Sequence, residues 1–159
     1  MSNVVFDIYQ EKWDKRFLEL AKHVAQWSKD PSTKVGAVIV DPTTKKVVSM
    51  GYNGFARGVK DTDERLNDRE TKLSLVVHAE LNAILQAERS VRGCDIYIWP
   101  TMMEPNCCPE CAKAIAQSGI KNVFGYSSSK PLSERWQKFA EYSTITLSES
   151  GVTYRRINE

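Results

Sequence analysis

The sequence predicts an α/β fold in which a five-stranded mixed sheet carries helices on both faces. Short apolar runs rich in β-branched residues alternate with longer segments whose apolar residues recur every three or four positions. The first two runs, 35–40 and 47–53, are joined by a turn and should pair antiparallel, whereas strands separated by helices should run parallel. The run 35–40 is apolar at odd and even positions alike, as expected for a strand that is buried on both faces.

The bulk properties fit one domain that spans residues 1–159. The chain has 159 residues, of which 42% are hydrophobic and 26% charged, and its formal net charge is +2. This charge is too small to suggest a nucleic-acid partner. No apolar run approaches the roughly 18 residues of a membrane helix, so no membrane partner is expected. Residues 1–7 lack the features of a secretory signal, so we expect a cytoplasmic protein whose four cysteines are ligands or free thiols.

The N-terminal half should form one helix followed by the hairpin. An amphipathic helix is predicted over 11–28, ending before Pro31 because the residue before a proline avoids helical angles. The residues on its apolar face are Trp13, Phe17, Leu20, Ala21, Val24 and Trp27. The turn 41–46 then joins the two strands.

Residues 54–74 have no clean period and are highly charged. Structureless stretches of about twenty residues are uncommon in compact domains. This segment is therefore predicted to be an insertion, either a solvated loop with a short helix or a ligand-binding element.

The C-terminal half should continue the alternation of helices and strands. The predicted order is a helix over 78–88, a strand over 94–99, a loop over 101–107, a helix over 109–119, a strand over 121–126, a helix over 132–150 and a short strand over 152–155.

The residues that indicate chemistry are His78, Cys108 and Cys111, with Glu80 two positions after the histidine. One imidazole and two thiolates are three ligands for Zn²⁺, and the fourth position stays open, as in catalytic zinc sites. A closed structural site would need a fourth ligand from Cys94 or Cys107. A Cys-x-x-Cys pair alone could also be a redox pair. Glu80 favours catalysis, because a structural site has no use for it.

The two metal-binding turns are predicted at helix N-termini, where the helix dipole favours an ionised carboxylate such as that of Glu80. Cys107 offers an alternative to Cys108, because Cys107 and Cys111 are spaced i, i+4. We prefer Cys108, since Pro109 fits the first position of the helix that follows it.

Several blocks in one order make the chain resemble the deoxycytidylate (dCMP) deaminases of the cytidine deaminase superfamily. The blocks lie within the range from about Trp13 to Val123. The first block, 28–31, leads into the strand 35–40, and Gly51-Tyr52-Asn53-Gly54 precedes the charged insertion. The two zinc helices resemble those of the family at 78–84 and 108–113.

The resemblance implies a three-layer α/β/α sandwich and zinc-dependent hydrolysis of dCMP to dUMP, with release of ammonia and supply of dUMP for thymidylate synthesis. His78, Cys108 and Cys111 would hold Zn²⁺, and Glu80 would shuttle protons. The resemblance places Asn53 at the sugar or base and the Ala79 backbone at the base. Ser28 and Lys29 would lie near the 5′-phosphate, where a lysine is a mobile point charge.

The family also implies regulation. Many members are hexamers that are activated by dCTP and inhibited by dTTP, with Mg²⁺ on the triphosphate. The matching region here gives Gly51, Tyr52, Gly54 and Arg57 as candidate effector residues.

The sequence departs from the family pattern just before the zinc cysteines. Cys107 stands where the family usually has proline, and the stretch 99–106 is longer than usual. A 5-substituted dCMP is therefore an alternative substrate. A deaminase of tRNA or single-stranded nucleic acid is a second possibility, which the lack of a basic, aromatic-rich tract disfavours. A zinc-binding module without activity is a third, and Glu80 disfavours it.

Overall fold

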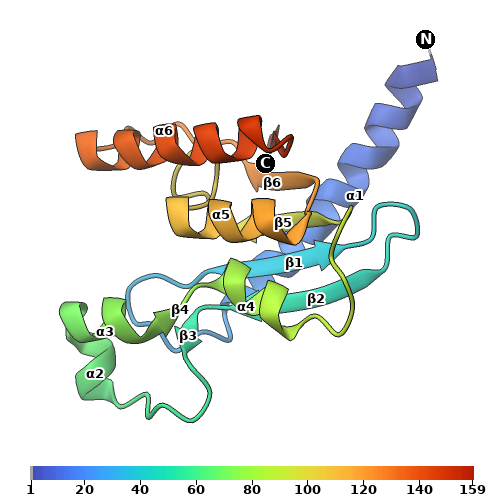
Figure 1. The fold of residues 1–159 in the computed structure, drawn as a ribbon. Helices are drawn as coiled ribbons and strands as arrows, with labels where there is room; N and C mark the ends of the chain where they lie inside the picture. Colours follow the sequence, from blue (N-terminus) through green and yellow to red (C-terminus); the bar gives the residue numbers. More distant parts are fainter. Residues whose placement is uncertain (1) are drawn as a thin grey trace.

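The computed structural model describes residues 2–159, with side chains described from residue 8 onward. Its main sheet has the strand order β2-β1-β5-β6-β7. One face is covered by α1 and the other by α4 and α5, so the predicted three-layer α/β/α sandwich is confirmed (Figure 1). The strands are β1 (Gly36–Val40), β2 (Val47–Tyr52), β5 (Asp95–Trp99), β6 (Asn122–Tyr126) and β7 (Thr153–Ile157).

The sheet is mixed in the way that the sequence predicted. β1 and β2 form an antiparallel hairpin, and β5, β6 and β7 run parallel to one another. β5 pairs antiparallel with β1, so β2 and β5 run in the same direction without being neighbours. β1 lies between β2 and β5 and is covered by α1 on one face and α4 on the other, which explains why it is buried along its whole length.

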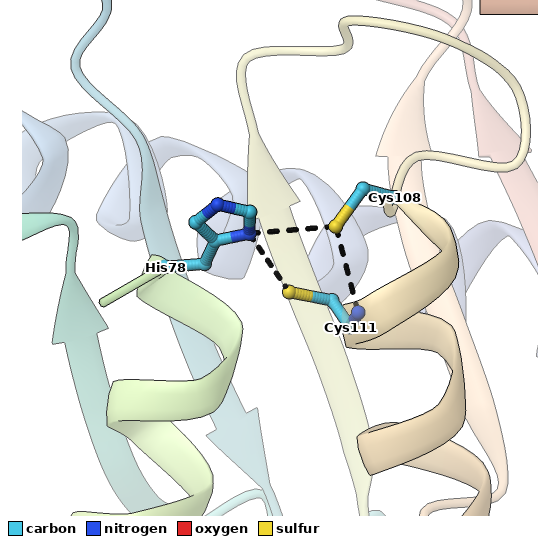
Figure 2. A group of neighbouring side chains, drawn as sticks. All are labelled: His78, Cys108 and Cys111. Atoms are coloured by element: carbon cyan, nitrogen blue, oxygen red, sulfur yellow. Dashed lines mark hydrogen bonds between the residues drawn. The ribbon is translucent and has the colours of Figure 1, made fainter. Parts of the chain in front are cut away.

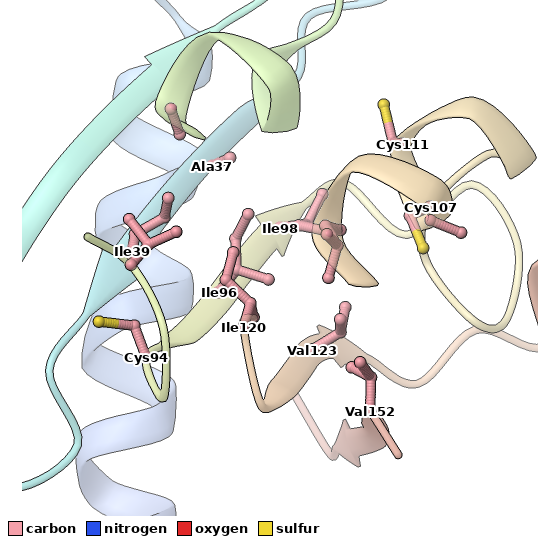
Figure 3. Packing of buried hydrophobic residues seen from close by; sticks show 14 of the residues in the cluster. Ala37, Ile39, Cys94, Ile96, Ile98, Cys107, Cys111, Ile120, Val123 and Val152 are labelled. Atoms are coloured by element: carbon pink, nitrogen blue, oxygen red, sulfur yellow. The ribbon is translucent and has the colours of Figure 1, made fainter. Parts of the chain in front are cut away.

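Alternation along the strands divides the core into two layers. Ile39, Ile96 and Val123 belong to the layer that packs against α4 and α5 (Figure 3). Val38 and Tyr97 point the other way, against α1. The period of two residues in a strand is the physical cause of this division.

The main helices are α1 (Ser2–Ala25), α4 (Ala79–Gln86), α5 (Pro109–Ser118) and α6 (Glu134–Glu149). The first helix begins nearer the N-terminus than predicted, where the chain has neither proline nor glycine to interrupt it, and it ends at Ala25, three residues earlier than predicted. Trp27 was expected on its buried face, but it lies past the helix end and is 51% exposed. Met1 lies outside the described residues.

The insertion at 54–74 is more ordered than a surface loop. It contains α2 (Asp63–Asn67) and α3 (Arg69–Leu75), capped by the side chains of Thr62 and Asp68. A two-stranded sheet of β3 (Gly54–Phe55) and β4 (Val76–Val77) closes its base. Two-residue strands show no alternation, which is why the sequence did not indicate them.

None of the helices within residues 2–159 has both the length and the apolar character needed to cross a membrane.

Candidate metal centre and substrate pocket

Two helix N-termini bring the candidate metal ligands together. His78 is the N-cap residue of α4 and Cys108 is the N-cap residue of α5, both with extended backbone angles. Cys111 follows in the first turn of α5, and Pro109 occupies the first helical turn as predicted. The packing of α4 beside α5 therefore places residues that are 30 positions apart on one site (Figure 2).

The geometry of these three side chains fits Zn²⁺. His78 Nδ1 lies 3.3 Å from Cys111 Sγ and 3.4 Å from Cys108 Sγ. Zn–N bonds of about 2.0–2.1 Å and Zn–S bonds of about 2.3 Å imply N···S separations of about 3.5 Å in a tetrahedral site. The donor atoms all lie within 4.8 Å of one another. The donor set of one imidazole and two thiols is also one that zinc prefers.

The site favours the thiolate form of one of its two cysteines, Cys108, whereas the pKa of Cys111 is raised because its thiol donates to Cys108. The pKa of Cys108 falls to about 4, chiefly because the Cys111 thiol donates a hydrogen bond to its sulfur. Burial opposes this effect, while His78 adds to it. The backbone N–H of Cys111 also donates to Cys108 Sγ at 3.5 Å. A thiolate is the form of cysteine that binds zinc.

Glu80 lies at the inner end of the pocket and is only 6% exposed. Burial is the largest cause that raises the pKa of its carboxyl group. A carboxyl group whose pKa is moved toward neutrality is suited to both accept and donate a proton.

Cys107 is buried but does not join the metal cluster. Within the described residues that cluster consists of His78, Cys108 and Cys111. Figure 3 shows the sulfur atoms of Cys107 and Cys111 pointing in different directions. The Cys107 carbonyl accepts a hydrogen bond of 2.8 Å from Ser143 Oγ, which ties the residue to α6. Burial raises the pKa of its thiol. The structure therefore favours the choice of Cys108 over Cys107.

A cavity of about 270 Å³ opens over the candidate ligands. Ala79 and Glu80 form part of its inner wall, and Asn53 lines it from the end of the first hairpin. The stretch 99–107 contributes Met102 and Met103 among others, so this long segment does border the pocket. Arg69, Lys72 and Trp136 also line it, although the sequence did not single them out as site residues. Arg69 and Lys72 are two of many charged residues in the insertion, and Trp136 fits the apolar pattern of the predicted helix over 132–150.

Asn53 organises the wall of this cavity. Its side-chain Oδ1 accepts from the Val35 N–H at 2.9 Å, and its Nδ2 donates to the Thr33 carbonyl at 2.8 Å. Its backbone carbonyl accepts from Ser28 Oγ at 2.8 Å. The amide thus holds the loop before β1 in place, and one N–H of Nδ2 remains for a ligand.

The two residues that the resemblance put near a phosphate do not line the metal pocket. Ser28 is buried and lines neither this cavity nor its neighbour. Lys29 forms an ion pair with Asp61 at 2.9 Å and lines a second cavity of about 200 Å³.

The candidate effector residues are divided among different environments. Tyr52 and Gly54 line the second cavity, whereas Arg57 lines neither cavity. Gly51 packs β2 against α4, and an added Cβ there would collide with the Ala79 carbonyl oxygen. Gly51 therefore allows the close approach that positions the start of α4.

Comparisons with known proteins agree with this site. The family model described as "Cytidine and deoxycytidylate deaminase zinc-binding region" matches residues 11–127. An uncharacterised deaminase from the luxG 3′ region of Aliivibrio fischeri is 43% identical over 141 residues, covering 89% of this chain and 90% of the relative. The deoxycytidylate deaminase of Mus musculus is 40% identical over 158 residues, covering 94% of this chain and 82% of the relative.

A solved structure shows the same fold. The crystal structure of dCMP deaminase from the cyanophage S-TIM5, in complex with dCMP and dUMP, superposes with a TM-score of 0.67. It is 22% identical in sequence and covers 90% of this chain and 95% of the phage protein. The family match, the relatives and the His/Cys/Cys cluster together show that the chain belongs to the zinc-dependent cytidine and deoxycytidylate deaminases.

Proposed function

We propose that this enzyme hydrolyses dCMP to dUMP and ammonia. The main support for the proposal is that His78, Cys108 and Cys111 lie together and that the buried Glu80 lines the same cavity. Relatives named deoxycytidylate deaminase, at about 40% identity over most of the chain, support dCMP as the substrate.

In the proposed site, His78, Cys108 and Cys111 hold one Zn²⁺. A bound zinc ion supplies a Lewis acid that lowers the pKa of a water molecule from 15.7 to about 7. Glu80 accepts a proton from the attacking water and delivers it to N3 of cytosine. The water oxygen bonds to C4. Glu80 then moves the remaining proton of the new C4 hydroxyl to the exocyclic nitrogen, the C4–N bond breaks as the C4=O bond forms, and ammonia leaves.

The chain orients the base with its backbone as well as its side chains. Ala79 is the first residue of α4, so its N–H has no partner within the helix. Ala79 lines the cavity, and in the proposed complex its N–H donates to a base oxygen. Apolar wall residues such as Ile98 and Met103 favour an aromatic ring and keep bulk water from Glu80.

A substrate panel tests this proposal. The zinc-loaded protein should release ammonia from dCMP with a kcat/KM about 10–100-fold above that for deoxycytidine, because a charge-assisted hydrogen bond to phosphate contributes about 1.5–3 kcal/mol. CMP, dCTP, 5-methyl-dCMP and tRNA complete the panel, with ammonia and the deaminated product measured for each.

If 5-methyl-dCMP is preferred over dCMP, the proposed substrate would change, but the proposed reaction, hydrolytic deamination, would stand. Preference for deoxycytidine or tRNA, or no ammonia from any substrate, would overturn the proposal.

A regulatory role for the second cavity is also proposed. Tyr52, Gly54 and Lys29 line it, and it shares Asp30, Asn53, Lys72 and Val76 with the metal pocket. We propose that dCTP and dTTP act there, with Mg²⁺ on the triphosphate, in a homo-oligomer such as a hexamer. Residues 1–159 would act as one catalytic domain. Adding each triphosphate to the dCMP assay, alongside light scattering, tests this part.

A further inference from the structure

We propose that Arg69, at the start of α3 in the insertion, binds the 5′-phosphate of the substrate, with Lys72 as a second contact from the same helix. This inference rests on the proposed function, since it assigns the phosphate subsite of the same pocket. The sequence resemblance suggests Ser28 and Lys29 for this role instead.

The lining of the metal pocket limits the choice of cation. Among the described residues that line it, the side chains with a fixed positive charge are those of Arg69 and Lys72. They are three positions apart on α3, so they share one face of the helix. Lys29 lines the second cavity instead, and its ammonium is held by Asp61 at 2.9 Å.

The charge of Lys72 is already balanced. Its Nζ lies 3.1 Å from Asp30 Oδ1 and 3.3 Å from Ser32 Oγ. The Lys72 side chain is 13% exposed and that of Asp30 is 9% exposed. The pKa of Asp30 lies below its usual value: burial raises it, but hydrogen bonds from the Thr33 and Ser32 N–H groups and from Lys72 lower it by more. An ammonium has three donors, so one N–H of Lys72 remains for a ligand.

The charge of Arg69 is not balanced. Among the side chains that the structure describes, no carboxylate lies within 4.0 Å of its guanidinium and no residue bonds to it. A guanidinium offers five N–H donors in a planar fork that suits a phosphate group. Arg69 is therefore the cation of this pocket that is available to an anion.

The position of Arg69 also matches the polarity of a nucleotide. Glu80, which must reach the base, is buried, whereas Arg69 is exposed on α3 at the outer part of the same pocket. A phosphate dianion is costly to remove from water, so it is expected at the exposed end. The base then points inward and the phosphate outward.

Local structure fixes α3 against the pocket. The Asp68 side chain accepts from the Thr71 N–H at 3.1 Å and caps the helix, and the β3–β4 pair closes the insertion. The Lys72–Asp30 ion pair joins α3 to the loop before β1. These contacts support the interpretation of the insertion as a ligand-binding element.

The test compares the variants Arg69→Gln and Arg65→Gln. Arg65 is an exposed arginine of the same insertion that lies outside the metal pocket. Arg69→Gln should raise KM for dCMP about 10–100-fold, with kcat changed less than about 3-fold, and leave kcat/KM for deoxycytidine unchanged. Inhibition by inorganic phosphate should weaken in parallel. Arg69→Lys should recover part of the loss, and Arg65→Gln should behave like the parent enzyme.

Equal losses for dCMP and deoxycytidine in Arg69→Gln, or an unchanged KM for dCMP, would overturn the inference. A rise in KM for dCMP in Lys29→Gln but not in Arg69→Gln would assign phosphate binding to Lys29, as the resemblance suggests, and not to Arg69. If the parent enzyme does not deaminate dCMP, the proposed function fails first, so the two failures are distinguishable.

Discussion

Replacing Glu80 with glutamine should lower kcat for dCMP by about 10²–10⁴-fold while the protein still binds one zinc ion per chain. Glutamine keeps the size of the side chain but cannot carry a proton. Glu80 is buried beside the three candidate ligands without being one of them. The loss should therefore fall on turnover and leave metal binding intact.

Glu110→Gln is a matched control for this prediction. Glu110 lies in the first turn of α5, is exposed and pairs with Lys113 at 2.8 Å. Its substitution should leave both kcat and zinc content near the parent values. Single-turnover rates and zinc analysis of both variants check the comparison, and retained turnover in Glu80→Gln would refute the proton-transfer role.

Cys108→Ser should lose zinc and activity together, whereas Cys107→Ser should keep both. Cys108 Sγ lies 3.4 Å from His78 Nδ1, while Cys107 lies outside the cluster. Removal of a direct ligand should weaken zinc affinity by more than the roughly 10–100-fold that loss of an outer-shell partner costs.

Zinc content after dialysis and ammonia release from dCMP measure this pair of variants. Cys107→Ser places a hydroxyl in a buried site, so a stability loss of about 1–3 kcal/mol is expected without loss of metal. Equal zinc loss in both variants would contradict the ligand assignment.

The sequence predicted the elements of the core well because they depend on local signals. The buried run that became β1 is apolar at every position, and Pro109 marks the start of α5. The grouping of His78, Cys108 and Cys111 could also be predicted, because each of them lies at or next to a helix N-terminus. These features need only a few neighbouring residues to be recognised.

The remaining features depend on contacts between distant segments. The pairing of β5 with β1 is set by the packing of the whole sheet. Asn53 bonds the backbone at residues 33 and 35, and this contact is visible only in three dimensions. The close contact of Gly51 with α4 is likewise visible only in the fold, and its candidate effector role stays a prediction. Arg69 sits among many charged residues of the insertion, so only the fold distinguishes it.

The most direct test of zinc-dependent deamination is the rate of dUMP and ammonia formation from dCMP as a function of bound zinc per chain. We expect no turnover in zinc-free protein and a rate that rises in proportion to bound zinc up to one ion per chain. Turnover in zinc-free protein, or none in protein carrying one zinc per chain, would contradict this mechanism.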